Sequence, residues 1–147
     1  MKIKPLFLSL AMAGMCSQAM ANAIDQNSYA NLDDVVTTHL NLDLDVDFAD
    51  KQLEGFVEHT LKWNNDTSKK LVLDTRDLDI DKVMYQDTSG DWHKAKFTLA
   101  DRDDVKGSKL TITLKSQAPK VRIYYNSRPE ASGLQWLTPE QTASKTH

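Results

Sequence analysis

A strict alternation of apolar and polar residues between Val36 and Phe48 constrains the fold of this chain more than any other feature. The even positions hold Val36, Thr38, Leu40, Leu42, Leu44, Val46 and Phe48. The odd positions hold Thr37, His39, Asn41, Asp43, Asp45 and Asp47. A period of two is typical of a strand with one face buried and one face wet. We therefore predict a long strand whose even-numbered side chains cover a core.

The following sequence reads as more strands separated by turn formers. Residues 53–63 predict the next strand, with Leu53, Val57, Leu61 and Trp63 facing inward. Further strands are predicted at 70–73, 78–85 (with Leu78, Ile80 and Met84 on one side), 92–99, 110–114 and 121–125. Turns or loops are predicted at 49–52, 64–68, 87–91, 101–108 and 117–119. No stretch shows a helical period, so we expect an all-β domain of packed, mostly antiparallel sheets, sandwich-like in layout.

The first residues have the layout of a secretory signal peptide. Lys2 and Lys4 precede an apolar run from residue 6 to residue 15, and alanines follow at 19, 21 and 23. The run is shorter than the roughly 20 residues that a membrane span needs. We predict that residues 1–23 are a signal peptide, that residues 24–147 form the mature domain, and that the protein is exported, to the periplasm or the medium. A lipid anchor on Cys16 is disfavoured, because Met15 stands where a lipobox requires a small residue.

Composition narrows the classes of function. The net charge is −3 and no basic patch stands out, so nucleic acid is not an expected partner. Cys16 is the only cysteine, and it would leave with the signal peptide. The mature domain would then hold neither a disulfide nor a thiol nucleophile, and nothing later in the chain is apolar for long enough to enter a bilayer.

The acidic residues imitate a calcium loop without its geometry. Asp43, Asp45, Asp47 and Glu54 fall at the spacing of EF-hand ligands, but Phe48 stands where that loop needs glycine. The alternation also requires extended backbone there, so we interpret the acids as a solvated strand face, relieved by cross-strand cations such as Lys51 or Lys62. A second acidic group, Asp101, Asp103 and Asp104, is interpreted as a solvated loop.

No residue in the chain forms a catalytic motif. His39, His59 and His93 are expected to be surface or half-buried strand residues, and His147 ends the sequence. None has a second histidine four residues away with a glutamate between, the pattern of a zinc-peptidase helix. We therefore predict no catalytic, substrate-binding or metal-binding residue here. Asn65–Thr67 matches the N-glycosylation sequon, and core packing is expected for most of Trp63, Trp92 and Trp136.

The last residues lack a strand pattern yet carry Leu134, Trp136 and Leu137. A solvated tail rarely contains three such side chains so close together, and a long structureless segment is uncommon in a compact domain. We expect this segment to pack either on the sheets or on a partner beyond His147.

Three stretches go beyond a strand pattern. The most specific is Gly-Leu-Gln-Trp-Leu-Thr-Pro-Glu-Gln-Thr at 133–142. The others are 71–78 with Ile80, Lys82 and Val83, and His39, Leu40 and Leu42 with the strand end at 46–48. All three closely resemble the M1 zinc metallopeptidases, in the branch of leukotriene A4 hydrolase and its aminopeptidase relatives. The resemblance covers about residues 28–147 and implies an N-terminal saddle-like β domain, followed in the family by a catalytic domain that binds zinc.

The family's HExxH helix and Gly-x-Met-Glu-Asn loop are absent from the sequence, so no site residue is carried over. The resemblance implies a non-catalytic domain that caps the active-site cleft of an exported aminopeptidase acting on peptides. The catalytic domain of the same parent chain, with its zinc, would be the partner, and the sequence would be a fragment. The alternative is a stand-alone exported β-sandwich module that binds a partner or saccharide.

Overall fold

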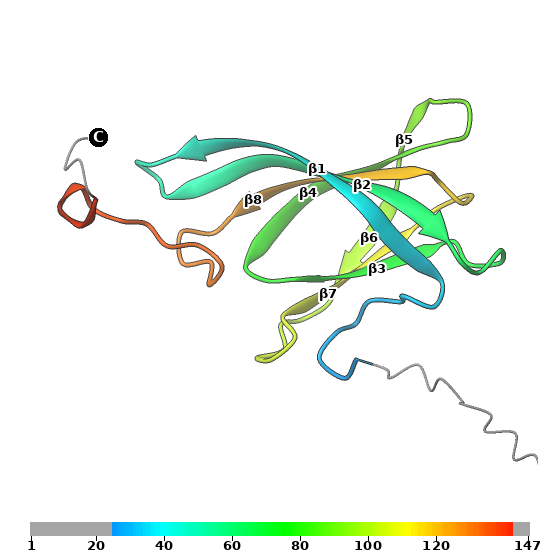
Figure 1. Ribbon diagram of the computed structural model, residues 1–147, viewed down its shortest axis with the longest axis horizontal. Helices are drawn as coiled ribbons and strands as arrows, with labels where there is room; N and C mark the ends of the chain where they lie inside the picture. The colour runs from blue at the N-terminus through cyan, green and yellow to red at the C-terminus, as the bar shows by residue number, and fades with distance from the viewer. Residues whose placement is uncertain (1–24, 143–147) are drawn as a thin grey trace, which may run out of the picture.

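The computed structural model describes residues 25–142, which form eight strands and one short 3₁₀ helix (Figure 1). In chain order these are β1 (Val35–Asp47), β2 (Gln52–Trp63), β3 (Lys70–Thr75), β4 (Leu78–Gln86), β5 (Trp92–Lys94), β6 (Lys96–Leu99), β7 (Ser108–Thr113), β8 (Lys120–Ser127) and η1 (Pro139–Gln141). No helix within 25–142 is long and apolar enough to cross a membrane. The predicted signal peptide, Cys16 and His147 lie outside the described residues.

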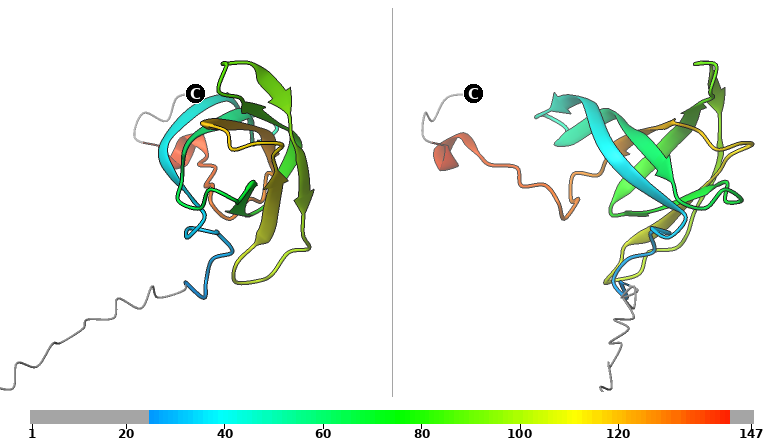
Figure 2. Two further views of the ribbon diagram at one scale, coloured as in Figure 1. Left: turned by 90° about the vertical axis from the view of Figure 1, so that its right-hand side faces the viewer. Right: turned by 45° about the vertical axis from the view of Figure 1, so that its right-hand side comes forward.

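The strands form two antiparallel sheets, which confirms the predicted all-β class. The larger sheet has the order β1-β2-β8-β4-β5, and the smaller has the order β3-β7-β6 (Figures 1 and 2). The small sheet covers one face of the large sheet, here called the inner face. The opposite face is called the outer face.

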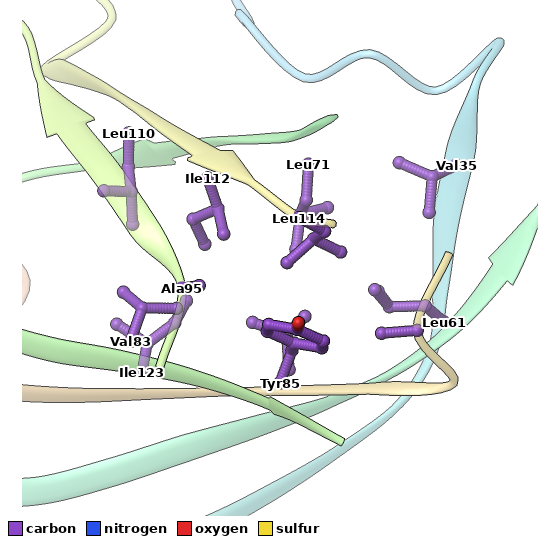
Figure 3. Close-up of a cluster of buried hydrophobic side chains, with 12 residues drawn as sticks. Val35, Leu61, Leu71, Val83, Tyr85, Ala95, Leu110, Ile112, Leu114 and Ile123 are labelled. Atoms are coloured by element: carbon purple, nitrogen blue, oxygen red, sulfur yellow. The ribbon is translucent and has the colours of Figure 1, made fainter. Parts of the chain in front are cut away.

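The core lies between the two sheets and consists mainly of aliphatic side chains. Leu110 and Ile112 of β7 are fully buried and face Val83 of β4 and Ile123 of β8 across the layer (Figure 3). These side chains recur at every second residue, so each strand contributes one face to the core. Of the four inward residues predicted in β2, Leu61 is buried and Val57 and Trp63 pack against the core, whereas Leu53 is half-buried and lies outside it.

The long predicted strand is present as β1, but its apolar face is mostly not buried. Leu40, Leu42 and Val46 keep 49%, 57% and 50% of their surface exposed. These side chains stay exposed because the small sheet covers only the start of β1. There, a bulge between Thr37 and His39 shifts the register, so that Val35 is buried in place of the predicted Val36.

Two other strands depart from the prediction. In β4 a register shift between Ile80 and Lys82 moves Val83 and Tyr85 to the inner face, so Met84, predicted beside Ile80, lies on the outer face. The strand predicted at 92–99 is interrupted at Ala95. Its halves, β5 and β6, belong to different sheets, so the chain crosses from one layer to the other at this residue.

Candidate functional site

The C-terminal segment, residues 128–142, leaves the sheets after β8 and returns to the β1–β2 hairpin. The right-hand view of Figure 2 shows it running away from the core as an orange and red trace. Trp136 meets Phe48, at the hairpin turn, edge to face, with ring centroids 5.9 Å apart and ring planes at 85°. The prediction that this segment packs on something is confirmed for Trp136, whose partner is the hairpin turn.

A groove of about 560 Å³ opens where this segment meets the hairpin. It is lined by Phe48, Lys51, Gln135, Trp136, Leu137, Thr138, Pro139 and Thr142. Phe48 and Leu137 keep 77% and 52% of their surface exposed, so the contact leaves much apolar surface uncovered. The Nε1–H group of Trp136 is buried and has no acceptor among the described residues. Burying a donor without an acceptor costs free energy of folding. The unpaired donor and the exposed apolar side chains together resemble one side of an interface.

Local hydrogen bonds shape the C-terminal segment. The Arg128 N–H donates to the Asp77 carbonyl at 3.1 Å, and the Leu134 N–H donates to the Ala131 carbonyl at 2.9 Å. At the start of η1, the Thr138 N–H donates to Oε1 of Gln141 at 2.9 Å. The Thr-Pro-Glu-Gln run therefore supplies its own N-terminal cap, and the groove rests on a defined turn.

The outer face of the large sheet carries a buried carboxylate between two cations. Glu58 of β2 is only 7% exposed. Its Oε1 accepts from Lys120 Nζ at 2.7 Å, and its Oε2 accepts from Arg122 Nη2 at 2.6 Å. The hydrogen bond from Lys120, with that from Arg122, lowers the pKa of Glu58. Both cations neighbour it because β2 and β8 pair in register.

Aromatic rings enclose the same cluster. The Arg122 guanidinium lies 4.3 Å from the Phe56 ring centroid and 4.5 Å from that of Trp92. Lys82 Nζ lies 4.1 Å above the Tyr124 ring. Of the three tryptophans expected mostly in the core, only Trp63 packs there, and its Nε1–H donates to the Ala118 carbonyl at 2.9 Å. Glu58 already pairs with both Lys120 and Arg122, so we assign this cluster to the scaffold.

The acids of β1 lie on the outer face beside the hairpin. Asp45 is directly opposite Glu54, and both line a shallow groove of about 410 Å³ with Asp47. Extended backbone throughout β1 excludes a calcium loop. The expected relief by Lys51 or Lys62 is wrong, because no ion pair within residues 25–142 involves Asp43, Asp45 or Asp47. Lys62 lies opposite Val36, far along the strand, and Lys51 forms part of the turn.

The described histidines are scattered over the large sheet. His39 and His93 are exposed strand residues as expected, and His93 Nε2 lies 2.7 Å from Asp87 Oδ2. His59 differs from the expectation because it is buried, 8% exposed, with Nδ1 3.0 Å from Thr37 Oγ1, and burial lowers its pKa. No group of three histidine, cysteine, aspartate or glutamate residues in the described part could hold a metal, so these residues do not fit a zinc site.

Known proteins resemble most of the chain. Residues 36–135 match the family model of the peptidase M1 N-terminal domain. The chain is 40% identical over 124 residues to a leucine aminopeptidase 2 of Yarrowia lipolytica, covering 82% of this chain and 18% of that protein. It is 34% identical over 128 residues to a leukotriene A-4 hydrolase of Xenopus laevis, covering 84% and 20%.

A solved structure of the same kind of protein has a similar fold. Native leukotriene A4 hydrolase from Saccharomyces cerevisiae superposes with a TM-score of 0.72 at 29% identity, over 85% of this chain and 20% of that one. The chain thus spans about a fifth of the length of the relatives it matches. The family match over residues 36–135 and this superposition agree with the two packed antiparallel sheets of the structure. The chain therefore belongs to the M1 peptidase family and corresponds to its N-terminal domain.

Proposed function

We propose that this chain is the non-catalytic N-terminal β domain of an exported M1 zinc aminopeptidase, and that it caps the active-site cleft of the full-length enzyme. The contact between Trp136 and Phe48 carries the proposal. It holds the segment 133–142 beyond the sheets, with Leu137 exposed and the Trp136 Nε1–H unpaired. Such a surface suits a second domain that supplies apolar side chains and a hydrogen-bond acceptor.

The chemistry would belong to that second domain. In the full-length enzyme, zinc would polarise the scissile carbonyl of a peptide and activate a water molecule. The residues described here would contribute no ligand to the metal, and their role would be to restrict access to the cleft.

Two measurements test the catalytic part of the proposal. The gene is expected to encode an HExxH motif in frame beyond the His147 codon. A reading frame without that motif would contradict the proposal that the parent is a zinc aminopeptidase. The purified chain is expected to hold no stoichiometric zinc and to leave leucine p-nitroanilide intact. Zinc-dependent turnover by the chain alone would contradict its non-catalytic role.

The capping role is tested in the full-length enzyme with Trp136→Ala. We expect a lower kcat/KM for peptides, because the groove loses the large side chain of one of its lining residues. Val105→Ala is the matched control, since Val105 is 70% exposed in a loop remote from the groove. Equal kcat/KM for both variants and the parent would contradict the capping role.

Export is proposed from the first residues of the sequence. The mature protein, recovered from the periplasm or the medium, should begin after Ala23. A chain that stays in the cytoplasm with its first residues intact would contradict export.

A free exported binding module is the second candidate, favoured by the exposed apolar face of β1. Limited proteolysis separates the two. A self-sufficient module should protect Trp136, whereas a domain that lacks its partner should lose the C-terminal segment first.

A further inference from the structure

The link between β3 and β4 holds one of the two non-glycine residues with positive φ among residues 25–142. The link consists of Arg76 and Asp77, and it carries the chain from the small sheet to the large sheet. Asp77 has φ of 57°, and the other such residue, Lys51 with φ of 53°, lines the groove beside Trp136. Left-handed backbone is uncommon outside glycine and persists where the surrounding structure fixes it.

Asp77 contacts the C-terminal segment through both its main chain and its side chain. Its carbonyl oxygen accepts from the Arg128 N–H at 3.1 Å. Its Oδ2 accepts from the Ser132 N–H at 3.3 Å, and its Oδ1 pairs with Arg102 Nη1 at 2.9 Å. One residue therefore joins the start of the C-terminal segment to the link between the sheets and to the loop at residues 100–107.

The side chain of Asp77 is nearly buried, with 7% of its surface exposed. Taking a carboxylate out of water costs free energy, and only hydrogen bonds and a nearby cation offset that cost. Asparagine or glycine would adopt the left-handed backbone of the link without burying a charge. The carboxylate is thus explained by its contacts with Arg102 and Ser132 rather than by the turn.

The turns that follow connect this anchor to the groove. The Ala131 N–H donates to the Arg128 carbonyl at 3.0 Å, and the Leu134 N–H donates to the Ala131 carbonyl at 2.9 Å. Ala131 is buried. Trp136, which contacts Phe48, comes two residues after Leu134. Because each turn begins where the previous one ends, the direction in which the segment leaves Asp77 sets the position of Trp136.

A second ion pair at the start of the segment is a weaker anchor. Arg128 Nη2 pairs with Asp79 Oδ1 at 2.7 Å, but the two side chains are 51% and 58% exposed. Exposed ion pairs contribute little to stability, because water screens them and both side chains lose freedom. The buried carboxylate of Asp77 is therefore the main side-chain contact that holds the start of the segment.

We propose that Asp77 is a positioning residue, which holds the first turn of the C-terminal segment against the sheets and thereby places Trp136 in the groove that meets the catalytic domain. The placement of Trp136 follows from contacts within this chain alone. Its effect on peptide hydrolysis rests on the proposed capping function, so the two parts are tested separately.

Hydrogen exchange in the purified chain tests the anchor. Asp77→Gly keeps the left-handed backbone available and removes the carboxylate. We expect the Leu134 amide and the Trp136 indole N–H to exchange at least about tenfold faster than in the parent, because local opening of the segment becomes easier. The amides of β8 should keep the parent's rates. Nuclear magnetic resonance follows these protons, and Trp136→Phe identifies the indole signal.

Asp66→Gly is the matched control, because it makes the same substitution in an exposed loop at the other end of β3. It should exchange like the parent. Unchanged exchange at Leu134 and Trp136 in Asp77→Gly would overturn the proposal. An equal rise throughout β8 would also overturn it, because that result shows a general loss of stability.

Asp77→Asn is the second variant, and it retains an oxygen acceptor for the Ser132 N–H. Asparagine also tolerates left-handed backbone, so this variant should fold even where Asp77→Gly does not. Its exchange at Leu134 and Trp136 should rise less than in Asp77→Gly. An equal or larger rise would overturn the role of the hydrogen bond to Ser132, and with it the proposal.

Kinetics of the full-length enzyme test whether Asp77 acts through Trp136. Asp77→Gly and Trp136→Ala should each lower kcat/KM for peptides. The double variant should be no slower than Trp136→Ala, because both changes remove the same placed side chain from the groove. Losses that multiply in the double variant would give Asp77 a separate role and overturn the proposal, as would the parent's kcat/KM in Asp77→Gly beside a lowered value in Trp136→Ala.

The outcome for Trp136→Ala separates this proposal from the capping function. A Trp136→Ala enzyme with the parent's kcat/KM would contradict capping. Hydrogen exchange at Leu134 and Trp136 would still decide whether Asp77 holds the segment.

Discussion

Trp136 and Phe48 meet edge to face with ring centroids 5.9 Å apart, although one follows the last strand and the other follows the first. This contact links the C-terminal segment to the β1–β2 hairpin. Edge-to-face aromatic pairs contribute about 0.5–1.5 kcal/mol beyond the area they bury. The link is therefore modest, and opening of the segment should be measurable.

Phe48→Ala should free the C-terminal segment. We expect chymotrypsin to cleave after Leu134, Trp136 or Leu137 about three to ten times faster than in the parent, because local opening controls access. Mass spectrometry of the early fragments measures the rate. Val105→Ala, which removes exposed surface in another loop, should cleave like the parent. The same rate in all three proteins would mean that the aromatic contact does not hold the segment.

Glu58→Gln should destabilise the large sheet. The amide keeps the shape of the side chain but removes the charge that Lys120 and Arg122 share, and hydrogen bonds to charged groups contribute about 1.5–3 kcal/mol. We expect a loss of about 1–3 kcal/mol in urea unfolding.

Asp79→Asn is the matched control for Glu58→Gln. Asp79 pairs with Arg128 at 2.7 Å, but its side chain is 58% exposed, and exposed pairs contribute about 0–1 kcal/mol. Equal losses of unfolding free energy in the two variants would show that the buried Glu58 cluster stabilises the protein no more than an exposed ion pair does.

His59 should make stability depend on pH. Burial lowers its folded pKa below the ordinary value of 6.5, so the unfolded chain binds the proton more readily. Stability is therefore full above pH 6.5 and falls as the pH drops from 6.5 through the lowered folded pKa. The contribution of Glu58 is lost separately, below its ordinary value of 4.5.

Urea unfolding above and below pH 6.5 measures this dependence. His59→Gln should reduce the loss of stability on acidification, because the buried titrating group is gone. His39→Gln removes an exposed histidine from the neighbouring strand and should keep the parent's slope. A slope unchanged in His59→Gln would assign the dependence to other groups.

Gly107→Ala should destabilise the turn before β7. Gly107 has φ of 76°, and an added Cβ would lie 2.2 Å from the Thr75 carbonyl oxygen. Strained backbone of this kind costs about 1–3 kcal/mol, which would appear as a lower unfolding midpoint. Gly133→Ala has no heavy atom within 4 Å of the new Cβ and should keep the parent's midpoint. A Gly107→Ala midpoint equal to the parent's would show that the turn can relax.

Local patterns predicted most of the strands, because alternation and turn formers act over a few residues. The strands at residues 53–63 and 121–125 and the hairpin at 87–91 lie where the sequence placed them. The bulges in β1 and β4 were missed, since a single extra residue leaves no compositional mark and depends on the partner strand. The break at Ala95 was missed because 92–99 contains no turn-forming residue, although its halves pair in different sheets.

The candidate site was only half predictable. Leu134, Trp136 and Leu137 marked the segment as one that packs on something, but nothing in the sequence pointed to Phe48, which looked like an inward residue of the first strand. Hydrophobicity indicates that a side chain avoids water, and only the fold decides which surface covers it.

The sequence by itself determined that this is an all-β chain, that its strands alternate, and that it resembles the N-terminal domain of M1 peptidases. The tertiary structure alone decided which alternating faces are buried. It placed Leu110 and Ile112 in the core, left Leu40 and Leu42 on an open edge, and enclosed Glu58 between two cations. The physical reason is that alternation is a property of one strand, whereas burial depends on which other strand or sheet lies against it.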